Sequence, residues 1–174
     1  MTKVTNSIKN KLKNIELVIT DVDGVLTDGG MYYTAQGDSM KKFHTRDGMG
    51  VTLLRKHNIP TIIITKEKTP MMQNWAKKMK IKKIYDDVKI KENLLDEITR
   101  TFNVKFNEIA YIGDDVNDIN LMKLVGFSVS PKDGIFQATK IADYVCKCNG
   151  GEGVLRETVD LILTTKYPNK ENWY

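Results

Sequence analysis

Short apolar runs rich in β-branched residues recur along the chain, and each stops at a polar residue or a glycine. The clearest runs lie at residues 17–20, 61–65 and 109–112, and weaker ones follow at 126–129 and 144–145. Short apolar runs bounded by turn residues are typical of strands that are buried on both faces of a parallel sheet. The runs therefore predict such a sheet at the centre of the fold.

Segments with helical spacing of apolar residues lie between these runs. They are expected at residues 51–59, 70–79, 94–102, 119–124 and 154–163. Pro70 stands at the start of the second segment, where proline suits the first turn of a helix. Strands that alternate with helices predict an α/β fold with a doubly wound parallel sheet.

The length and composition fit one globular domain over residues 1–174. Apolar residues make up 41% of the chain and charged residues 28%, which is typical of globular proteins rather than of disordered or membrane proteins. The first 14 residues are polar and contain several lysines, with no apolar stretch typical of a secretory signal. We therefore expect no membrane partner and a cytoplasmic location.

The chain has a formal net charge of +5, which permits binding to anions. Its densest group of lysines lies within residues 77–83, with no aromatic residues between them that could stack on bases. We expect a solvated surface there and no nucleic-acid partner. The two cysteines, Cys146 and Cys148, lack a second pair of zinc ligands, so we expect reduced residues in the core or at an interface.

One segment departs from the alternation. Residues 29–34 and 39–44 flank the sequence Ala35-Gln36-Gly37-Asp38, which predicts a β-hairpin insertion over about 29–44 with a four-residue turn. The polar segment at about 165–174 is expected to be a frayed end.

Two acidic clusters carry the strongest functional signal. Asp21 and Asp23 follow the first apolar run, and residues 114–118 follow the run at 109–112. Ligand sites in open α/β sheets lie at the carboxyl ends of strands, so neighbouring strands would bring these carboxylates together. Crowded carboxylates repel one another unless a cation lies among them, and oxygen ligands suit Mg²⁺. A single cluster is equally compatible with helix caps and turns, but two clusters favour a metal site.

These motifs resemble those of a known superfamily. The segment Asp21–Gly30, Thr65, Lys91 and the cluster at 113–118 are similar to the motifs of haloacid dehalogenase-type phosphatases, over roughly residues 16–163. The resemblance is closer to a capless sugar-acid phosphatase subfamily that acts on 3-deoxy-D-manno-octulosonate 8-phosphate or on nonulosonate (sialic-acid-type) 9-phosphates. The closer match rests on three further segments, residues 42–48, 110–115 and 150–157.

The resemblance implies a Mg²⁺-dependent phosphoric monoester hydrolase with an aspartyl-phosphate intermediate. Asp21 matches the nucleophile, which is also a metal ligand. Asp23 matches the general acid and base, and its backbone carbonyl matches a second metal ligand. Asp114 matches the remaining metal carboxylate. Thr65 and Lys91 match the groups that bind the transferring phosphoryl oxygens and offset their charge.

Further positions follow from the same resemblance. Asp118 is expected to hold a metal-bound water, and Asp115 to orient the lysine. Lys89 is a rival for that lysine, but the spacing of 22 residues before Gly113 favours Lys91. Two positions depart from the family pattern, because Lys66 stands where a small residue is usual and Asp87 stands near a usual glycine.

The spacing of the motifs leaves no room for a cap domain. Asp21 and Thr65 are 44 residues apart, and Thr65 and Lys91 are 26 apart, which the hairpin, two helices and one short strand fill. Members of the resembling subfamily cover their open sites by forming homotetramers through the hairpins, so a homotetramer is expected here. The alternative is that the hairpin packs on its own core.

The substrate-binding residues are expected to be basic. Arg46 is the candidate for pairing with a sugar carboxylate, with Lys66 and Arg156 as further cations and Gly48 nearby. The segment at 46–48 leans toward an eight-carbon substrate and the segment at 150–153 toward nine-carbon substrates. The pathway implied is lipopolysaccharide or sialic acid biosynthesis, and the sequence leaves the two substrates open.

Two other functions remain compatible with the sequence. One is a phosphatase for another small phosphate or for a nucleic-acid 3′-phosphate. The other is a non-catalytic domain of the kind associated with an acylneuraminate cytidylyltransferase. The presence of every expected catalytic residue argues against the second function.

Overall fold

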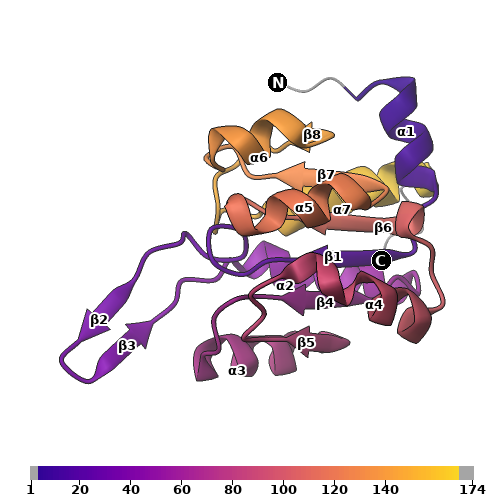
Figure 1. Ribbon diagram of the computed structural model, residues 1–174. Coiled ribbons are helices and arrows are strands. Elements are labelled where there is room, and N and C mark those ends of the chain that lie inside the picture. The colour runs from indigo at the N-terminus through magenta and orange to yellow at the C-terminus, as the bar shows by residue number, and fades with distance from the viewer. Residues whose placement is uncertain (1–3, 169–174) are drawn as a thin grey trace.

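A computed structural model describes residues 4–168 and contains the expected parallel sheet. Its six strands lie in the order β5-β4-β1-β6-β7-β8, and all neighbours are parallel (Figure 1). The strands are β1 (Leu17–Thr20), β4 (Thr61–Ile64), β5 (Lys83–Tyr85), β6 (Ile109–Ile112), β7 (Phe127–Ser130) and β8 (Tyr144–Val145). The prediction of a doubly wound α/β fold is therefore confirmed.

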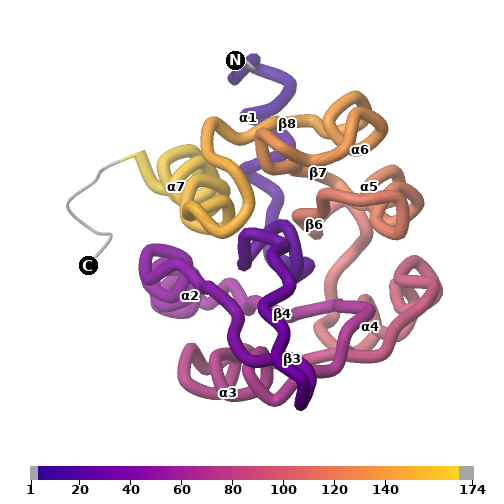
Figure 2. Tube along the Cα trace, turned by 90° about the vertical axis from the view of Figure 1, so that its left-hand side faces the viewer, coloured from indigo at the N-terminus to yellow at the C-terminus, as the bar shows by residue number. Residues whose placement is uncertain are grey.

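Helices cover both faces of this sheet (Figure 2). One layer consists of α1 (Asn6–Lys13), α2 (Thr45–Lys56), α3 (Pro70–Met79) and α7 (Val154–Lys166). The other consists of α4 (Leu95–Phe102), α5 (Ile119–Leu124) and α6 (Phe136–Ile141). Successive residues of β1 serve the two layers in turn, because Val18 packs into the first core and Leu17 and Ile19 into the second. This alternation explains why the first three residues of the strand are all apolar.

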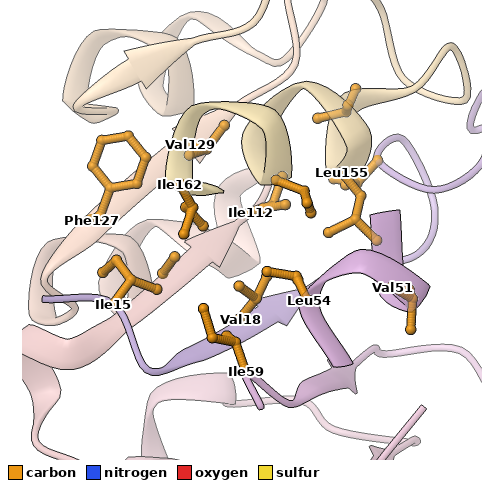
Figure 3. Packing of buried hydrophobic residues seen from close by; sticks show 14 of the residues in the cluster. Ile15, Val18, Val51, Leu54, Ile59, Ile112, Phe127, Val129, Leu155 and Ile162 are labelled. Atoms are coloured by element: carbon orange, nitrogen blue, oxygen red, sulfur yellow. The ribbon is translucent and has the colours of Figure 1, made fainter. Parts of the chain in front are cut away.

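The C-terminal helix α7 fills the centre of the first core. Leu155 and Ile162 of α7 point toward the sheet, where Val18 and Ile112 lie, and all four are fully buried (Figure 3). Burial of side chains of this size contributes about 1.5–3 kcal/mol each. Helix α7 is therefore an integral part of the first core.

The hairpin projects away from the sheet (Figure 1). It consists of β2 (Tyr32–Thr34) and β3 (Gly37–Met40), joined by a two-residue turn instead of the predicted four. Met31, Tyr33 and Met40 are exposed by 77%, 61% and 52%, so the alternative that the hairpin packs on its own core is wrong. Among residues 4–168 no cap domain covers the strand ends, as expected.

Several boundaries differ from those predicted. Helix α2 begins at Thr45 rather than at Val51, because the His44 side chain accepts a hydrogen bond from the Arg46 N–H and caps the helix. Apolar periodicity starts only later in that helix and could not reveal its first turn. Helices α1 and α6 were not expected.

The end of the chain also differs from expectation. Helix α7 continues to Lys166, so the segment predicted as a frayed end begins inside a helix. The last six residues, 169–174, lie outside the described residues. Between residues 4 and 168 no helix has the length and apolarity needed to span a bilayer.

Candidate active site

The order of the strands brings the expected site residues to one edge of the sheet. β4, β1 and β6 are neighbours, and their carboxyl ends lead into Thr65, Asp21 and the acidic cluster that begins at Asp114. A pocket of about 140 Å³ opens there. Its lining residues are Asp21, Asp23, Thr65, Lys66, Glu67, Asp114, Asp115 and Asn117.

The loop after β1 holds Asp21 at the base of this pocket. The Asp21 residue is only 5% exposed, and its Oδ1 accepts a hydrogen bond from the Val22 N–H at 2.7 Å. Gly24 follows with φ +83°, and a Cβ atom there would collide with the Asp114 carboxylate. Glycine is therefore required at this position by both backbone conformation and space.

A buried lysine joins the acidic residues. Lys91 is fully buried, and its Nζ lies 2.8 Å from Asp21 Oδ2 and 2.7 Å from Asp118 Oδ1. The Tyr111 hydroxyl donates to the same Asp118 oxygen at 2.6 Å. Lys89 is exposed. The structure thus brings Lys91, rather than its rival, to the carboxylates.

The roles expected of Asp115 and Asp118 need correction. Asp118, not Asp115, contacts the lysine, and its Oδ2 also accepts from the Asp114 and Asp115 N–H groups. Asp115 is exposed, and its carboxylate caps the following turn by accepting from the Val116 N–H. The exchange follows from geometry, because Asp118 turns back under the loop toward Gly113, where a Cβ atom would collide with its side chain.

The crowding of these groups changes their acidity. Burial, together with the nearby Asp118 charge, raises the pKa of Asp21 to about 7 against the opposing effect of Lys91. Burial and the charges of Asp21, Asp118 and Asp115 raise the pKa of Asp114 to about 8. For Lys91, burial acts to lower the pKa, but Asp21 and Asp118 outweigh it and the pKa is raised. The site is therefore short of positive charge.

The same residues fit a magnesium ion. One carboxylate oxygen each of Asp21, Asp114 and Asp118 lies within 4.8 Å of the other two. The Oδ1 atom of Asp114 is buried, and no hydrogen-bond donor from residues 4–168 reaches it. Three carboxylates against one ammonium leave a formal charge of −2 in a buried place. An all-oxygen, doubly negative site suits a divalent hard cation.

The end of β4 supplies the remaining wall of the pocket. Thr65 is buried, and its hydroxyl accepts from the Glu67 N–H, while Lys66 is exposed on the rim. Asp87, which stands near a glycine usual in the resembling family, has a positive φ of 56°. Such a conformation favours glycine but is also open to aspartate, so this departure preserves the backbone path.

The structure does not bring the other predicted substrate residues to this pocket. Arg46 and Arg156 line a different hollow, of about 750 Å³, between α2, β8 and α7. Gly48 is buried where a Cβ atom would collide with Met79 of α3. Arg46 and Gly48 precede the helix expected from residue 51, but the structure places them in the first turn of α2, and Arg156 lies in the first turn of α7.

Asp47 gives that turn a structural role. Its Oδ1 accepts from the Arg156 N–H at 2.8 Å and so caps the start of α7. Burial, partly offset by these backbone hydrogen bonds, raises the pKa of Asp47 to about 7. The segments 46–48 and 150–157 are therefore in contact, but this contact connects the first turns of α2 and α7 and does not line the pocket.

Some residues of the site were missed by the sequence analysis. Tyr111 lies inside an apolar strand, where only its hydroxyl signals a polar partner. Glu67 lines the pocket without belonging to a recognisable motif, and Asn117 lines it from within the cluster at 113–118, where no role was expected of it. Nζ of Lys41, which follows the hairpin, lies 2.5 Å from Oδ1 of Asp23. No spacing in the sequence indicates that contact.

Comparisons with known proteins agree with this geometry. The profile of the haloacid dehalogenase-like hydrolases matches residues 61–157. A 3-deoxy-D-manno-octulosonate 8-phosphate phosphatase of Haemophilus influenzae is 35% identical over 156 residues, which cover 90% of this chain and 87% of the relative.

Solved structures extend the likeness to three dimensions. The enzyme of the same name from Yersinia pestis is 35% identical, with a TM-score of 0.90 over 92% of this chain and 87% of that one. That from Moraxella catarrhalis was solved with magnesium, phosphate and 3-deoxy-D-manno-octulosonate (KDO). It is 33% identical, with a TM-score of 0.92 over 96% of each chain.

Proposed function

Because the chain belongs to the haloacid dehalogenase-like hydrolase family, we propose that it hydrolyses the phosphate monoester of a 3-deoxy sugar acid, with 3-deoxy-D-manno-octulosonate 8-phosphate as its substrate. The observation that carries this proposal is the buried Lys91 between Asp21 and Asp118, beside an Asp114 oxygen that lacks a donor. The eight-carbon substrate is supported by the names of relatives that match nearly the whole chain.

The first chemical step uses two carboxylates from the loop after β1. Asp21 attacks phosphorus, and the bond from phosphorus to the sugar oxygen breaks as the aspartyl-phosphate forms. Asp23 gives its proton to the departing sugar oxygen. In the second step Asp23 takes a proton from water, which attacks phosphorus and releases phosphate, so that Asp21 is regenerated.

Other groups stabilise the charge that moves during these steps. Lys91, which contacts Asp21, and the Thr65 hydroxyl, which lines the pocket, would bind phosphoryl oxygens. Asp21, Asp114 and the Asp23 backbone carbonyl would hold Mg²⁺, which supplies positive charge opposite the phosphoryl group when it is bound. Asp118 and Tyr111 keep the lysine in place from below.

The sugar carboxylate needs a cation at the mouth of the pocket. Lys66 is the best candidate among the predicted basic residues, because it is exposed and lines the pocket. Arg46 and Arg156 line a separate hollow, and this argues against a direct part in binding.

The assembly and location form a further part of the proposal. One domain over residues 1–174 would form a homotetramer, in which exposed Met31, Tyr33 and Met40 of the hairpins meet and cover the open site. Free Cys146 and Cys148 suit the reducing cytoplasm. The preserved set of catalytic residues argues against a purely non-catalytic domain.

A substrate panel tests the proposal. The purified protein is assayed with Mg²⁺ on 3-deoxy-D-manno-octulosonate 8-phosphate, a nonulosonate 9-phosphate, simple sugar phosphates and a DNA 3′-phosphate. We expect kcat/KM to be highest for the eight-carbon acid. A higher kcat/KM for the nine-carbon acid or for the DNA 3′-phosphate would mean that this compound, and not the eight-carbon acid, is the substrate.

Variants test the mechanism in the same assay. Asp21→Asn should remain folded and lose about 10⁴-fold or more in kcat, as expected for a nucleophile. Asp115→Asn is the matched control, because Asp115 lines the same pocket but contacts neither Lys91 nor Asp21. Full activity of Asp21→Asn would exclude the covalent mechanism.

A further inference from the structure

We propose that Lys41, directly after the second hairpin strand, is a positioning residue that fixes the carboxylate of Asp23 at the pocket. The inference rests on the proposed function, in which Asp23 is the proton donor. Lys41 Nζ lies 2.5 Å from Asp23 Oδ1, and the Thr27 hydroxyl donates to the same oxygen at 3.1 Å. Two donors from different segments therefore hold one oxygen of this carboxylate.

The other oxygen of Asp23 is left for chemistry. Within the described chain, no donor lies at hydrogen-bonding distance from Asp23 Oδ2. A carboxylate that is held through one oxygen keeps a fixed direction for the other. Oδ2 is thus the atom that would face the leaving sugar oxygen and, later, the water.

The ion pair between Lys41 and Asp23 is largely shielded from solvent. The Lys41 side chain is 11% exposed and that of Asp23 is 30% exposed. Exposed ion pairs typically contribute only about 0–1 kcal/mol, because both side chains remain mobile and hydrated. A lysine that gives up most of its hydration to reach one carboxylate is held in a defined place.

The position of Asp23 explains why its orientation matters. Asp23 and Glu67 line both the pocket at the strand ends and a second hollow, of about 200 Å³, beside the hairpin. Of these two hollows, Lys41 lines the one beside the hairpin and not the pocket at the strand ends. The lysine thus holds Asp23 from the hairpin side, and the carboxylate borders the pocket of Asp21 on its other side.

The base of the hairpin is firm enough for this role. Thr27 and Phe43 form an antiparallel bridge across the base of the insertion. The Phe43 ring stacks on Trp75 of α3, with centroids 4.9 Å apart and planes within 10°. Lys41 stands two residues before this anchored point, so its backbone is tied to the core rather than to the exposed hairpin tip.

A neighbouring ion pair provides a matched control. Lys42 lies 3.8 Å from Asp28, also across the base of the hairpin, but its side chain is 58% exposed and does not reach Asp23. If Lys41 only fastened the hairpin, removal of either lysine should have similar effects. If it positions Asp23, only its own removal should alter proton donation.

The experiment measures kcat/KM, which reports the steps up to departure of the leaving group, for a series of phosphate monoesters. The series runs from 4-nitrophenyl phosphate, whose leaving group needs no proton, to simple alkyl phosphates, whose leaving group does. Lys41→Met should lower kcat/KM about ten-fold more for the alkyl esters than for 4-nitrophenyl phosphate, as expected when general acid catalysis is impaired. Lys42→Met should lower neither value more than about two-fold, and Lys41→Arg should restore part of the loss.

Three results would overturn the inference. An equal loss for all esters would reduce Lys41 to a structural role, and no loss would mean that Asp23 is held without it. In an Asp23→Asn background, Lys41→Met should add no further dependence on the leaving group, and an added ten-fold dependence would also contradict the inference. If Lys41→Met fails to fold, Lys41→Gln is measured against the same criteria.

The series also keeps this inference separate from the proposed substrate. None of its esters carries a sugar acid, so a poor rate on 3-deoxy-D-manno-octulosonate 8-phosphate would overturn the substrate alone. The leaving-group dependence would still decide the role of Lys41.

Discussion

The base of the pocket and the hairpin above it are built on opposite principles. At the base, Asp21, Lys91 and Asp118 are almost wholly buried and joined by contacts of 2.7–2.8 Å. At the hairpin, Met31 and Tyr33 are mostly exposed and have no core to pack on. One region is complete within a single chain, whereas the other exposes apolar side chains that the proposed homotetramer would cover. Damage to the first should therefore show in any isolated chain, and damage to the second only in the proposed homotetramer.

The largest effect should follow from removing the buried cation. Lys91→Met leaves two buried carboxylates unpaired, which typically costs about 3–5 kcal/mol of unfolding free energy. Loss of its charge opposite the phosphoryl group should lower kcat by at least about 100-fold. Denaturant unfolding and steady-state kinetics measure the two effects.

The matched control is Lys89→Met, two residues earlier on the exposed surface. Its unfolding free energy should stay within about 0.5 kcal/mol of the wild-type value. Similar losses in both variants would mean that the buried ion pairs have no special weight.

The second effect is a pH dependence of stability that magnesium removes in part. Asp21 and Asp114 have folded pKa values of about 7 and 8 against a usual 3.8, so the folded state binds protons more tightly than the unfolded state. Without metal, stability should therefore fall as the pH rises from about 5.5 to 8.5, by roughly 2 kcal/mol or more, or about 4–8 °C in Tm. Thermal unfolding in EDTA at the two pH values measures this loss.

Mg²⁺ should raise Tm more at pH 8.5 than at pH 5.5, because it competes with protons for the same carboxylates. A part of the pH dependence of stability should remain in Mg²⁺, because Asp47 also has a raised pKa, about 7. Asp47 lies where α2 meets the start of α7, away from the proposed metal ligands. Asp47→Asn should remove that remaining part. An equal rise in Tm at both pH values would argue against a metal at these carboxylates.

The third effect should appear only in the assembly. Met31→Ser together with Met40→Ser removes apolar surface worth about 1.5–3 kcal/mol per side chain if it is buried between copies. The variant should sediment as a smaller species and keep its secondary structure. Phe136→Ser, at a residue 73% exposed on α6, is the control and should leave the sedimentation unchanged. An unaltered assembly in the hairpin variant would place the interface elsewhere.

The smallest effect concerns the rim of the pocket. Lys66→Ala should lower kcat/KM about ten-fold on the sugar-acid phosphate and spare 4-nitrophenyl phosphate, which has no carboxylate for the lysine to bind. Arg46→Ala should change both values less than about two-fold, because Arg46 lines a different hollow. A loss confined to the sugar acid in Arg46→Ala would reinstate the arginine as the substrate-binding residue.

The sequence allowed the base of the site to be predicted because strand ends are local features. Asp21 and Asp114 each follow an apolar run closely, so the local sequence alone places them at the carboxyl ends of their strands. The partners of Lys91 were harder, because the choice of Asp118 over Asp115 depends on the path of one turn after Gly113. The predicted position of Arg46, near the pocket, was wrong for a related reason. The His44 side chain caps α2, so the helix begins before the apolar periodicity on which the prediction relied.

Helix α7 has a consequence for how the chain folds during synthesis. Its first turn is tied to Asp47 by a hydrogen bond between residues 109 positions apart, and its apolar face fills the first core (Figure 3). A ribosome-bound chain that lacks this helix would expose the face of β1 and β6 that α7 covers. Such long-range closure is slow, and exposed apolar surface promotes aggregation. During synthesis this face of the first strand therefore stays uncovered until helix α7, far along the chain, has been made.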